Sequence, residues 1–329
     1  MIDSLDRYPR GHKAEPIEHV CERPFRSVSI SADGSCYICI CESWLPVSVG
    51  NIDSFQRLED VWLNSVARKL QKDIQDKKFT HCAVEHCGIK YYNIPQPTYR
   101  INVTLDDSCN LACPTCRRQM INHINGPLYQ QRLNRVKHFL NLLENFDQAL
   151  SIILIGSGDP LASAIMRPII LDWKPKAHQQ VILFTNGLLM KKLLPDSKIL
   201  SNISEFQISV DAGTKEVYEQ VRRPGKYEQL RENLDWLAAN RPKQSNVILK
   251  FTISSANAHD VENFARMCEH YGFKGEITKL DDWGTFDNFD NHDVIDNGNH
   301  QLHTTAIRQL VSVSKNKNIC LSPYFSKFL

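Results

Sequence analysis

Three cysteines, Cys109, Cys113 and Cys116, lie close together in the segment YRINVTLDDSCNLACPTCRR, directly after a short apolar run. Their spacing is C-x3-C-x2-C. Three thiolates on one tight loop can each bind one iron of a cubane iron–sulfur cluster, which holds four irons. The spacing therefore predicts a cluster whose fourth iron stays open for a ligand that does not come from the protein.

A second group of cysteines lies within residues 21–87. Asp33-Gly34 separates two runs of alternating apolar residues in RSVSISADGSCYICI, a pattern typical of a β-hairpin. The ends of this hairpin would bring Cys21 and Cys39 together. Cys82 and Cys87 follow a predicted helix and could complete a site with four thiolates.

Alternatives for this second group stay open at the level of sequence. A structural zinc site is the main one, with His81 and His86 as further candidate ligands. Zinc modules usually contain a C-x2-C pair, whereas the spacings here are C-x17-C and C-x4-C. Cys36 and Cys41 could also be ligands, although we expect them to be small buried apolar residues.

Composition limits the class of protein. A chain of 329 residues predicts one large α/β unit with a smaller module. The formal net charge is +2 and the charges are interspersed, so we expect no nucleic-acid partner. The amino terminus lacks the apolar core of a signal peptide, and no apolar run reaches the roughly 18 residues of a membrane span. We therefore expect a cytoplasmic protein in which eleven cysteines serve metal or redox chemistry.

From residue 98 onwards, strand and helix patterns alternate about six times. This alternation predicts a parallel sheet covered by helices, with near-continuous apolar strands. We divide the chain into a cysteine-rich module (1–97), the α/β unit (98–283) and a polar loop with a carboxyl-terminal extension (284–329). Within the module, Ser54 suits the N-cap of a helix. The strand candidates are 101–105, 151–155, 180–184, 205–210, 246–253 and 275–280, and the helix candidates between them are 128–146, 162–171, 188–194, 215–222 and 260–271.

Ligands of parallel sheets bind at the carboxyl ends of the strands. The three-cysteine loop follows the first strand, and glycine or polar residues follow the next three. Each of these could alone be a turn or a helix cap, but their common position predicts one composite ligand site. Its candidate residues are Gly156, Ser157, Gly158, Asp159, Asn186, Ser209, Asp211 and Arg222.

The three-cysteine loop, the turn GSGDP and the segment ISVDAGTKEVYEQVRR together resemble the radical S-adenosylmethionine (radical SAM) superfamily over about residues 99–280. The resemblance implies a partial (β/α)6 TIM-like barrel, with a [4Fe-4S] cluster on the three cysteines and S-adenosylmethionine on its open iron. It assigns residues 156–159 to the methionine ammonium, Ser209 and Asp211 to the ribose side, and Arg222 to the carboxylate. Thr115 stands where the family usually has an aromatic residue near the adenine.

Residues 1–97 resemble the SPASM or twitch domain, which binds auxiliary clusters. Cys21, Gly34 and Cys39 fit the opening of its pattern. The module usually follows the barrel and here precedes it, and its closing cysteine pair is C-x4-C instead of C-x2-C. The resemblance implies one auxiliary [4Fe-4S] cluster on Cys21, Cys39, Cys82 and Cys87.

The resemblance also implies the chemistry. A radical SAM enzyme cleaves S-adenosylmethionine reductively, and the resulting 5′-deoxyadenosyl radical takes a hydrogen from the substrate. We expect a peptide or sugar-like substrate that is oxidised, cross-linked or epimerised, and an electron donor such as flavodoxin or ferredoxin. The rival interpretations are a non-catalytic iron–sulfur electron-transfer protein and a zinc-stabilised α/β interaction protein.

Two isolated cysteines could serve as a hydrogen donor to a substrate radical. Cys268 lies in a helical pattern and is expected in the core. Cys320 lies on a possible short strand near the end of the chain and is the tentative donor. The Asp-, Asn- and His-rich segment between them lacks the spacing of a calcium loop and could touch substrate near the barrel mouth.

Overall fold

The computed structural model describes residues 20–40, 43–83, 87, 98–282 and 284–328. The strands of these residues join into one ten-stranded sheet in the order β10-β9-β8-β7-β6-β5-β4-β1-β2-β3. All neighbours from β4 to β10 are parallel, as are β1 and β4, whereas β1, β2 and β3 pair antiparallel. The sheet thus continues from the cysteine-rich region into the α/β unit without a break.

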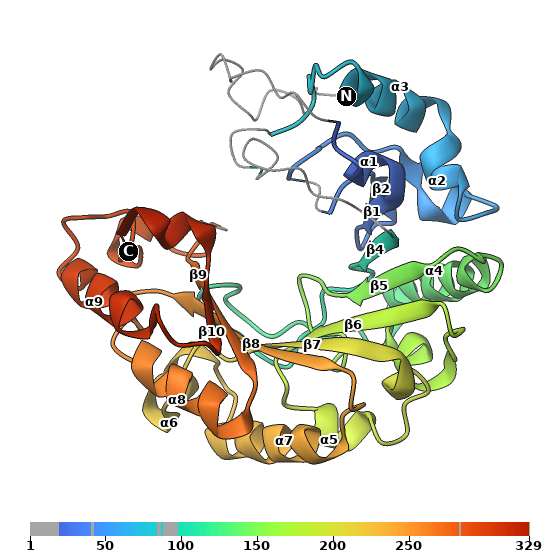
Figure 1. Cartoon of the computed structure of the whole chain (residues 1–329). Helices are drawn as coiled ribbons and strands as arrows, with labels where there is room; N and C mark the ends of the chain where they lie inside the picture. Colours follow the sequence, from blue (N-terminus) through green and yellow to red (C-terminus); the bar gives the residue numbers. More distant parts are fainter. Residues whose placement is uncertain (1–19, 41–42, 84–86, 88–97, 283, 329) are drawn as a thin grey trace.

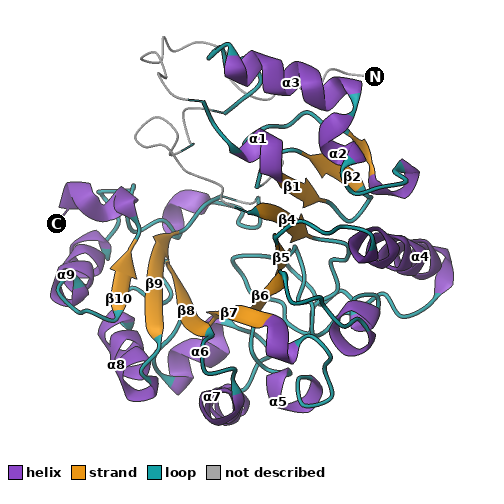
Figure 2. Ribbon diagram, turned by 45° about the vertical axis from the view of Figure 1, so that its right-hand side comes forward, coloured by secondary structure: helices purple, strands orange, loops and turns teal. Residues whose placement is uncertain are grey.

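The parallel strands curve into a partial barrel with helices on its outer side, which confirms the predicted fold class (Figure 1 and Figure 2). The strands are β4 (Tyr99–Val103), β5 (Leu150–Leu154), β6 (Gln179–Thr185), β7 (Ile203–Ser209), β8 (Asn246–Ile253), β9 (Lys274–Lys279) and β10 (Ile319–Leu321). The helices are α4 (Gly126–Glu144), α5 (Met190–Leu193), α6 (Lys215–Val221), α7 (Tyr227–Asn240), α8 (Val261–Tyr271) and α9 (His303–Val313), with a single π turn at Pro168–Asp172.

The burial pattern differs among the barrel strands. Strand β5 buries Ile152, Ile153 and Leu154 in succession, as expected for a near-continuous apolar strand, whereas β8 alternates. On β8, Val247, Leu249, Phe251 and Ile253 are buried, and the Phe251 ring lies 5.0 Å from that of Phe264 on α8. The residues between them are only half-buried because they face the inside of the barrel. The barrel therefore has an apolar outer face under the helices and a polar inner face.

The cysteine-rich region contains α1 (Arg23–Arg26), β1 (Ser27–Ile30), β2 (Ser35–Tyr37), β3 (Gly50–Asn51), α2 (Asp60–Leu63) and α3 (Ser65–Gln75). The predicted hairpin is β1 and β2, with Gly34 at φ +89° in its turn. The prediction that Ser54 caps the helix was wrong. Ser54 ends a 3₁₀ turn, and Asn64 caps α3 because its side chain accepts from the amides of Val66 and Ala67.

One apolar core joins the module to the barrel. The rings of Trp62, Tyr99 and Phe146 pack edge to face, with centroids 5.0 Å apart for the first two and 5.2 Å for the last two. Trp62 also donates to the carbonyl of Ser27 at 3.1 Å. Among the described residues, no helix is long and apolar enough to cross a membrane.

Candidate functional site

The three-cysteine loop follows the carboxyl end of β4 and forms one wall of a cavity of about 260 Å³. Most of the sequence-predicted ligand residues line the same cavity, because they follow the carboxyl ends of β5, β6 and β7. The lining residues are Cys109, Leu111, Cys113, Cys116, Arg117, Ile155, Gly156, Ser157, Gly158, Asp159, Phe184, Thr185, Asn186, Ser209 and Arg222. Asp211 is the one predicted residue of this set that does not line the cavity.

The three thiols differ in environment. Cys113 is buried, Cys109 is half-buried and Cys116 is exposed. Burial raises the pKa of Cys109 to about 11. Burial also raises the pKa of Cys113, although the guanidinium of Arg222, whose Nη1 donates to Cys113 Sγ at 3.6 Å, opposes this shift. Without a metal, both thiols therefore keep their protons near neutral pH.

Two arginines flank the thiols. Burial alone would lower the pKa of Arg117, but the adjacent Cys116 thiol outweighs it and raises this pKa. Arg222 contacts Cys113 from the other side. Three convergent sulfur donors, a neighbouring cavity and two cations suit an anionic iron–sulfur cluster with one free coordination position.

Arg222 is held by a buried ion pair. Its Nη2 lies 2.6 Å from Asp211 Oδ2, and both side chains are largely buried. Asp211 also accepts from the Thr252 amide at 2.7 Å and adopts φ +57°, which is uncommon for a residue other than glycine. Burial raises the pKa of Asp211 although Arg222 opposes it. Asp211 thus orients Arg222 towards Cys113.

The turn after β5 docks against the three-cysteine loop. The Asp159 amide donates to the Ser108 carbonyl at 2.8 Å, and a Cβ on Gly158 would lie 2.2 Å from that same oxygen. The Asp159 carboxylate is buried and accepts from Thr185 Oγ1 at 2.9 Å and the Asn186 amide at 2.6 Å. It therefore links the carboxyl ends of two adjacent strands.

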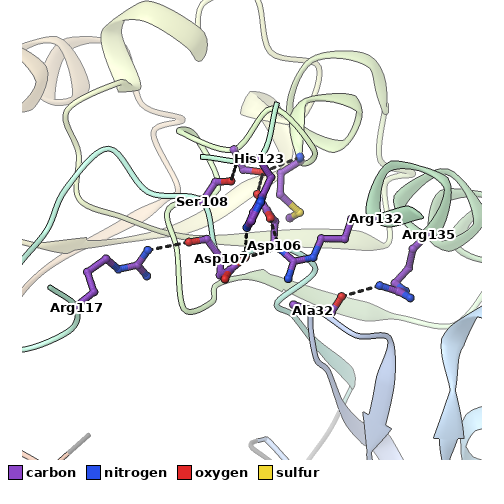
Figure 3. Close-up of polar contacts among 10 residues, drawn as sticks. Ala32, Asp106, Asp107, Ser108, Arg117, His123, Arg132 and Arg135 are labelled. Atoms are coloured by element: carbon purple, nitrogen blue, oxygen red, sulfur yellow. Dashed lines mark hydrogen bonds and ion pairs between the residues drawn. The ribbon is translucent and has the colours of Figure 1, made fainter. Parts of the chain in front are cut away.

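A polar network beneath the loop was not predicted from the sequence (Figure 3). Arg132 on α4 donates to Asp106 Oδ1 at 2.7 Å and also to Asp107 Oδ1. Ser163 donates to Asp106 Oδ2 at 2.6 Å, and His123 Nε2 lies 3.0 Å from Asp107 Oδ1. The Asp-Asp pair just before Cys109 was visible in the sequence, but its partners come from distant elements.

One turn further along α4, Arg135 binds the amino-terminal module. Its side chain is 3% exposed. Its Nη2 lies 2.7 Å from Asp53 Oδ2. Its Nη1 donates to the Ala32 carbonyl in the hairpin turn at 2.6 Å, as Figure 3 shows. Helix α4 thus holds the three-cysteine loop with Arg132 and the hairpin with Arg135.

The second thiol group has a more apolar setting. Cys21 is buried with Ile74 and Phe79, and Cys82 and Cys87 pack against them. Burial raises the pKa of Cys82 most, and the neighbouring thiols of Cys39, Cys21 and Cys87 raise it further, so these three thiols lie around Cys82.

The other candidate ligands are Cys36, Cys41, His81 and His86. Cys36 is fully buried in the main core, where its thiol donates to the Gly34 carbonyl at 3.6 Å. His81 is half-buried. Cys41 and His86 lie outside the described residues.

The two thiol groups lie at opposite ends of the strands. The three-cysteine loop follows the carboxyl end of β4. Cys21 precedes β1, which runs parallel to β4, and Cys39 follows β2, which runs antiparallel to β1. Asn102, on β4, donates to the Ile40 carbonyl. The inner face of the barrel therefore extends between the two thiol groups.

Cys320 lies on β10 and is exposed, whereas Cys268 is buried in α8. In the sheet register, Ser209, Lys250, Glu276 and Cys320 occupy one row across four adjacent strands. Ser209 lines the cavity and Cys320 does not. The row connects the cavity to the edge strand.

The polar segment after β9 reaches the three-cysteine loop. Arg118, two residues after Cys116, donates to Asp287 at 2.7 Å, and both side chains are well exposed. This single contact places part of the segment beside the loop.

Comparison with known proteins agrees with this geometry. Residues 104–268, half of the chain, match the model of the radical SAM superfamily, and residues 21–88 match that of SPASM, an iron–sulfur cluster-binding domain.

Curated relatives include the mycofactocin maturase MftC of Mycobacterium tuberculosis H37Rv, 25% identical over 173 residues, which are 53% of this chain and 42% of the relative. The AdoMet-dependent heme synthase of Methanosarcina barkeri Fusaro is 23% identical over 51% of this chain and 46% of the relative. The chain thus spans less than half the length of these two relatives.

Among solved structures, Streptococcus suis SuiB bound to S-adenosylmethionine is similar, with a TM-score of 0.45 and 12% identity over 80% of this chain and 62% of that chain. The matched ranges include the cysteines that line the cavity and those of the second thiol group. The chain belongs to the radical SAM superfamily and carries a SPASM iron–sulfur domain ahead of its barrel.

Proposed function

We propose that this protein is a radical SAM enzyme that modifies a peptide, with an auxiliary cluster that takes up or returns an electron. One observation carries the proposal: three thiols and the glycine-rich turn share one cavity at the carboxyl ends of the barrel strands, and Cys21 and Cys39 of the second thiol group lie towards the opposite ends.

In this proposal Cys109, Cys113 and Cys116 hold a [4Fe-4S] cluster. S-adenosylmethionine lies in the cavity against residues 156–159, Asn186 and Ser209, with Arg222 at its carboxylate and Asp211 keeping Arg222 in place. When bound, the cluster supplies an electron that cleaves the sulfonium to a 5′-deoxyadenosyl radical. The chain positions the reacting groups and excludes water.

Cys21, Cys39, Cys82 and Cys87 hold one auxiliary [4Fe-4S] cluster in this proposal. Four ligands would leave it no open position, which suits electron transfer better than substrate activation. Its burial among Ile74 and Phe79 would shield it from solvent. A flavodoxin or ferredoxin is the proposed donor to the enzyme.

The peptide is proposed over a sugar-like metabolite for two reasons. The polar inner face runs from the cavity to the edge strand β10, far enough for an extended molecule. The relative MftC is named a maturase. Cys320 on the same inner row is the proposed hydrogen donor if the net reaction is an epimerisation.

Anaerobic reconstitution with iron and sulfide tests the function. We expect about eight irons per chain, since two cubane clusters hold four each. We also expect release of 5′-deoxyadenosine after reduction with S-adenosylmethionine present. Mass spectrometry of deuterium transfer into 5′-deoxyadenosine from labelled peptides and sugars then identifies the substrate class. Bound zinc with no cofactor cleavage would contradict the proposal.

A further inference from the structure

The inner face of the barrel carries several charged side chains, and their orientation follows from the strand pattern. A Cβ on Gly275 would lie 2.8 Å from Cys268 Sγ on α8, so its neighbour Glu276 faces inward. Lys250 faces inward too, and its Nζ lies 2.6 Å from Glu276 Oε1. These two inner charges therefore neutralise each other.

Arg100 on β4 faces the same interior without such a partner. The preceding Tyr99 packs outward against Trp62 and Phe146, which turns Arg100 inward. Arg100 is half-buried, and its Nε is buried with no hydrogen-bond partner. Within the described part of the chain, none of its other nitrogens forms a hydrogen bond or ion pair. A buried Nε–H without an acceptor is costly, and an acceptor that reached the guanidinium would relieve this cost.

Other arginines with a buried, unpaired Nε differ from Arg100 in one respect. Each of them uses a terminal nitrogen on a partner within the protein. Arg23 donates to Cys87 at 3.8 Å, Arg132 to Asp106 at 2.7 Å, and Arg222 lies 2.6 Å from Asp211. Compared with these three arginines, Arg100 therefore keeps its terminal nitrogens available within the described residues.

Two charged residues lie near Arg100 in the described structure. Burial and the charge of Arg23 lower the pKa of Arg100, while Glu205 opposes this shift. Glu205 accepts from Gln207 at 2.6 Å and forms no ion pair with Arg100 among the described residues. Among the described residues Arg100 therefore has one cation and one carboxylate nearby and an ion pair with neither, which leaves its terminal nitrogens open to an anion from outside.

We propose that Arg100 binds a carboxylate of the substrate, namely an acidic side chain of a peptide. This inference rests on the proposed function and names the substrate chemistry. From residue 100 to the carboxyl end of β4 at Val103 the inner face spans about 10 Å, at about 3.3 Å per residue. An extended peptide anchored at Arg100 can therefore reach the cavity, and its anchored end lies towards the auxiliary thiols.

Chemical modification of the reconstituted wild-type protein tests this site without a variant that could misfold. p-Hydroxyphenylglyoxal modifies accessible arginines, and mass spectrometry of the digest follows each one. We expect N-acetylglutamate to slow modification of Arg100, and N-acetylglutamine amide to require about tenfold higher concentration for the same effect, as for the loss of one charge-assisted contact. Arg266, exposed on the outside of α8, is the internal control and should react equally with either compound.

Equal protection by the two compounds, or none by either, would overturn the proposal. Protection by inorganic phosphate but not by N-acetylglutamate would overturn it too, because the site would then bind phosphoryl groups. Release of 5′-deoxyadenosine is measured on the same sample. If release is absent while Arg100 is protected, the proposed function fails and the anion site stands. If 5′-deoxyadenosine is released while Arg100 is not protected, the proposed function stands and the anion site fails.

Discussion

The two thiol groups are built in opposite ways. The three-cysteine loop opens onto a cavity, includes the exposed Cys116, and is held by the ion pairs of Arg132 on α4 with Asp106 and Asp107. The second group is packed among apolar side chains, with Cys21 and Cys39 buried. A site that must admit a ligand cannot be enclosed by apolar packing, so polar contacts fix its backbone instead. A site that only passes electrons can be closed.

The largest expected effect comes from removing the open group. Replacing Cys109, Cys113 and Cys116 by Ala should abolish release of 5′-deoxyadenosine and remove about half of the bound iron, because one of two clusters is lost. Iron analysis and chromatography of the nucleoside measure both. Cleavage that survives the triple substitution would show that the two groups have been assigned the wrong way round.

Removing the closed group should have the complementary effect. Cys21→Ala with Cys82→Ala should also remove about half of the iron, while S-adenosylmethionine is still cleaved. Conversion of substrate to oxidised product should stop, since the electron acceptor is missing. Cys36→Ala is the matched control, because this cysteine lies in the main core away from the four thiols. Product formation at the wild-type rate in the double variant would refute the electron-transfer role.

Arg132→Met tests whether charges support the open group. The substitution leaves the fully buried Asp106 without its cation. Breaking a buried pair from one side costs roughly 3–5 kcal/mol, so urea unfolding should show a loss of this order. Lys215→Met, at an exposed ion pair, is the control and should unfold almost as the wild type does. An equal, small effect of both variants would mean that Arg132 does not stabilise the loop.

Arg135→Gln should have a smaller effect. Its partner Asp53 is 43% exposed and can be solvated when the cation is removed. We expect a loss of about 2 kcal/mol, the range of a hydrogen bond to a charged group. Hydrogen exchange should speed up in the hairpin around Ala32 and stay unchanged in the loop at residues 109–116. Faster exchange in both segments would show that α4 does not hold them separately.

Local patterns predicted much of this fold. Strand and helix alternation gave the parallel sheet, and Asp33-Gly34 gave the hairpin, because turn chemistry and periodicity act over a few residues. A helix was predicted at residues 162–171, where the structure has one π turn at Pro168–Asp172. Helices α7 and α9 were not predicted. Both Ser54 and Asn64 are residues that favour N-cap positions, so capping propensity alone does not show that Asn64 is the cap of α3.

Much of the site could also be predicted, because cysteine spacing and strand-end position are visible in one chain. The pairs Arg132–Asp106, Arg135–Asp53 and Arg222–Asp211 could not, since each joins residues from separate elements. Arg100 was missed for a related reason. An unpaired charge is recognised only when the rest of the interior is known.

The pairing of β1 with β4 has a consequence for any attempt to divide the protein. A fragment that begins at residue 98 would leave one side of β4 with unpaired backbone amides and carbonyls and would uncover the Tyr99 ring. Exposed strand edges of this kind recruit other chains and promote aggregation. The module therefore covers the exposed edge of the barrel sheet at β4. We expect the module and the barrel to unfold as one cooperative unit.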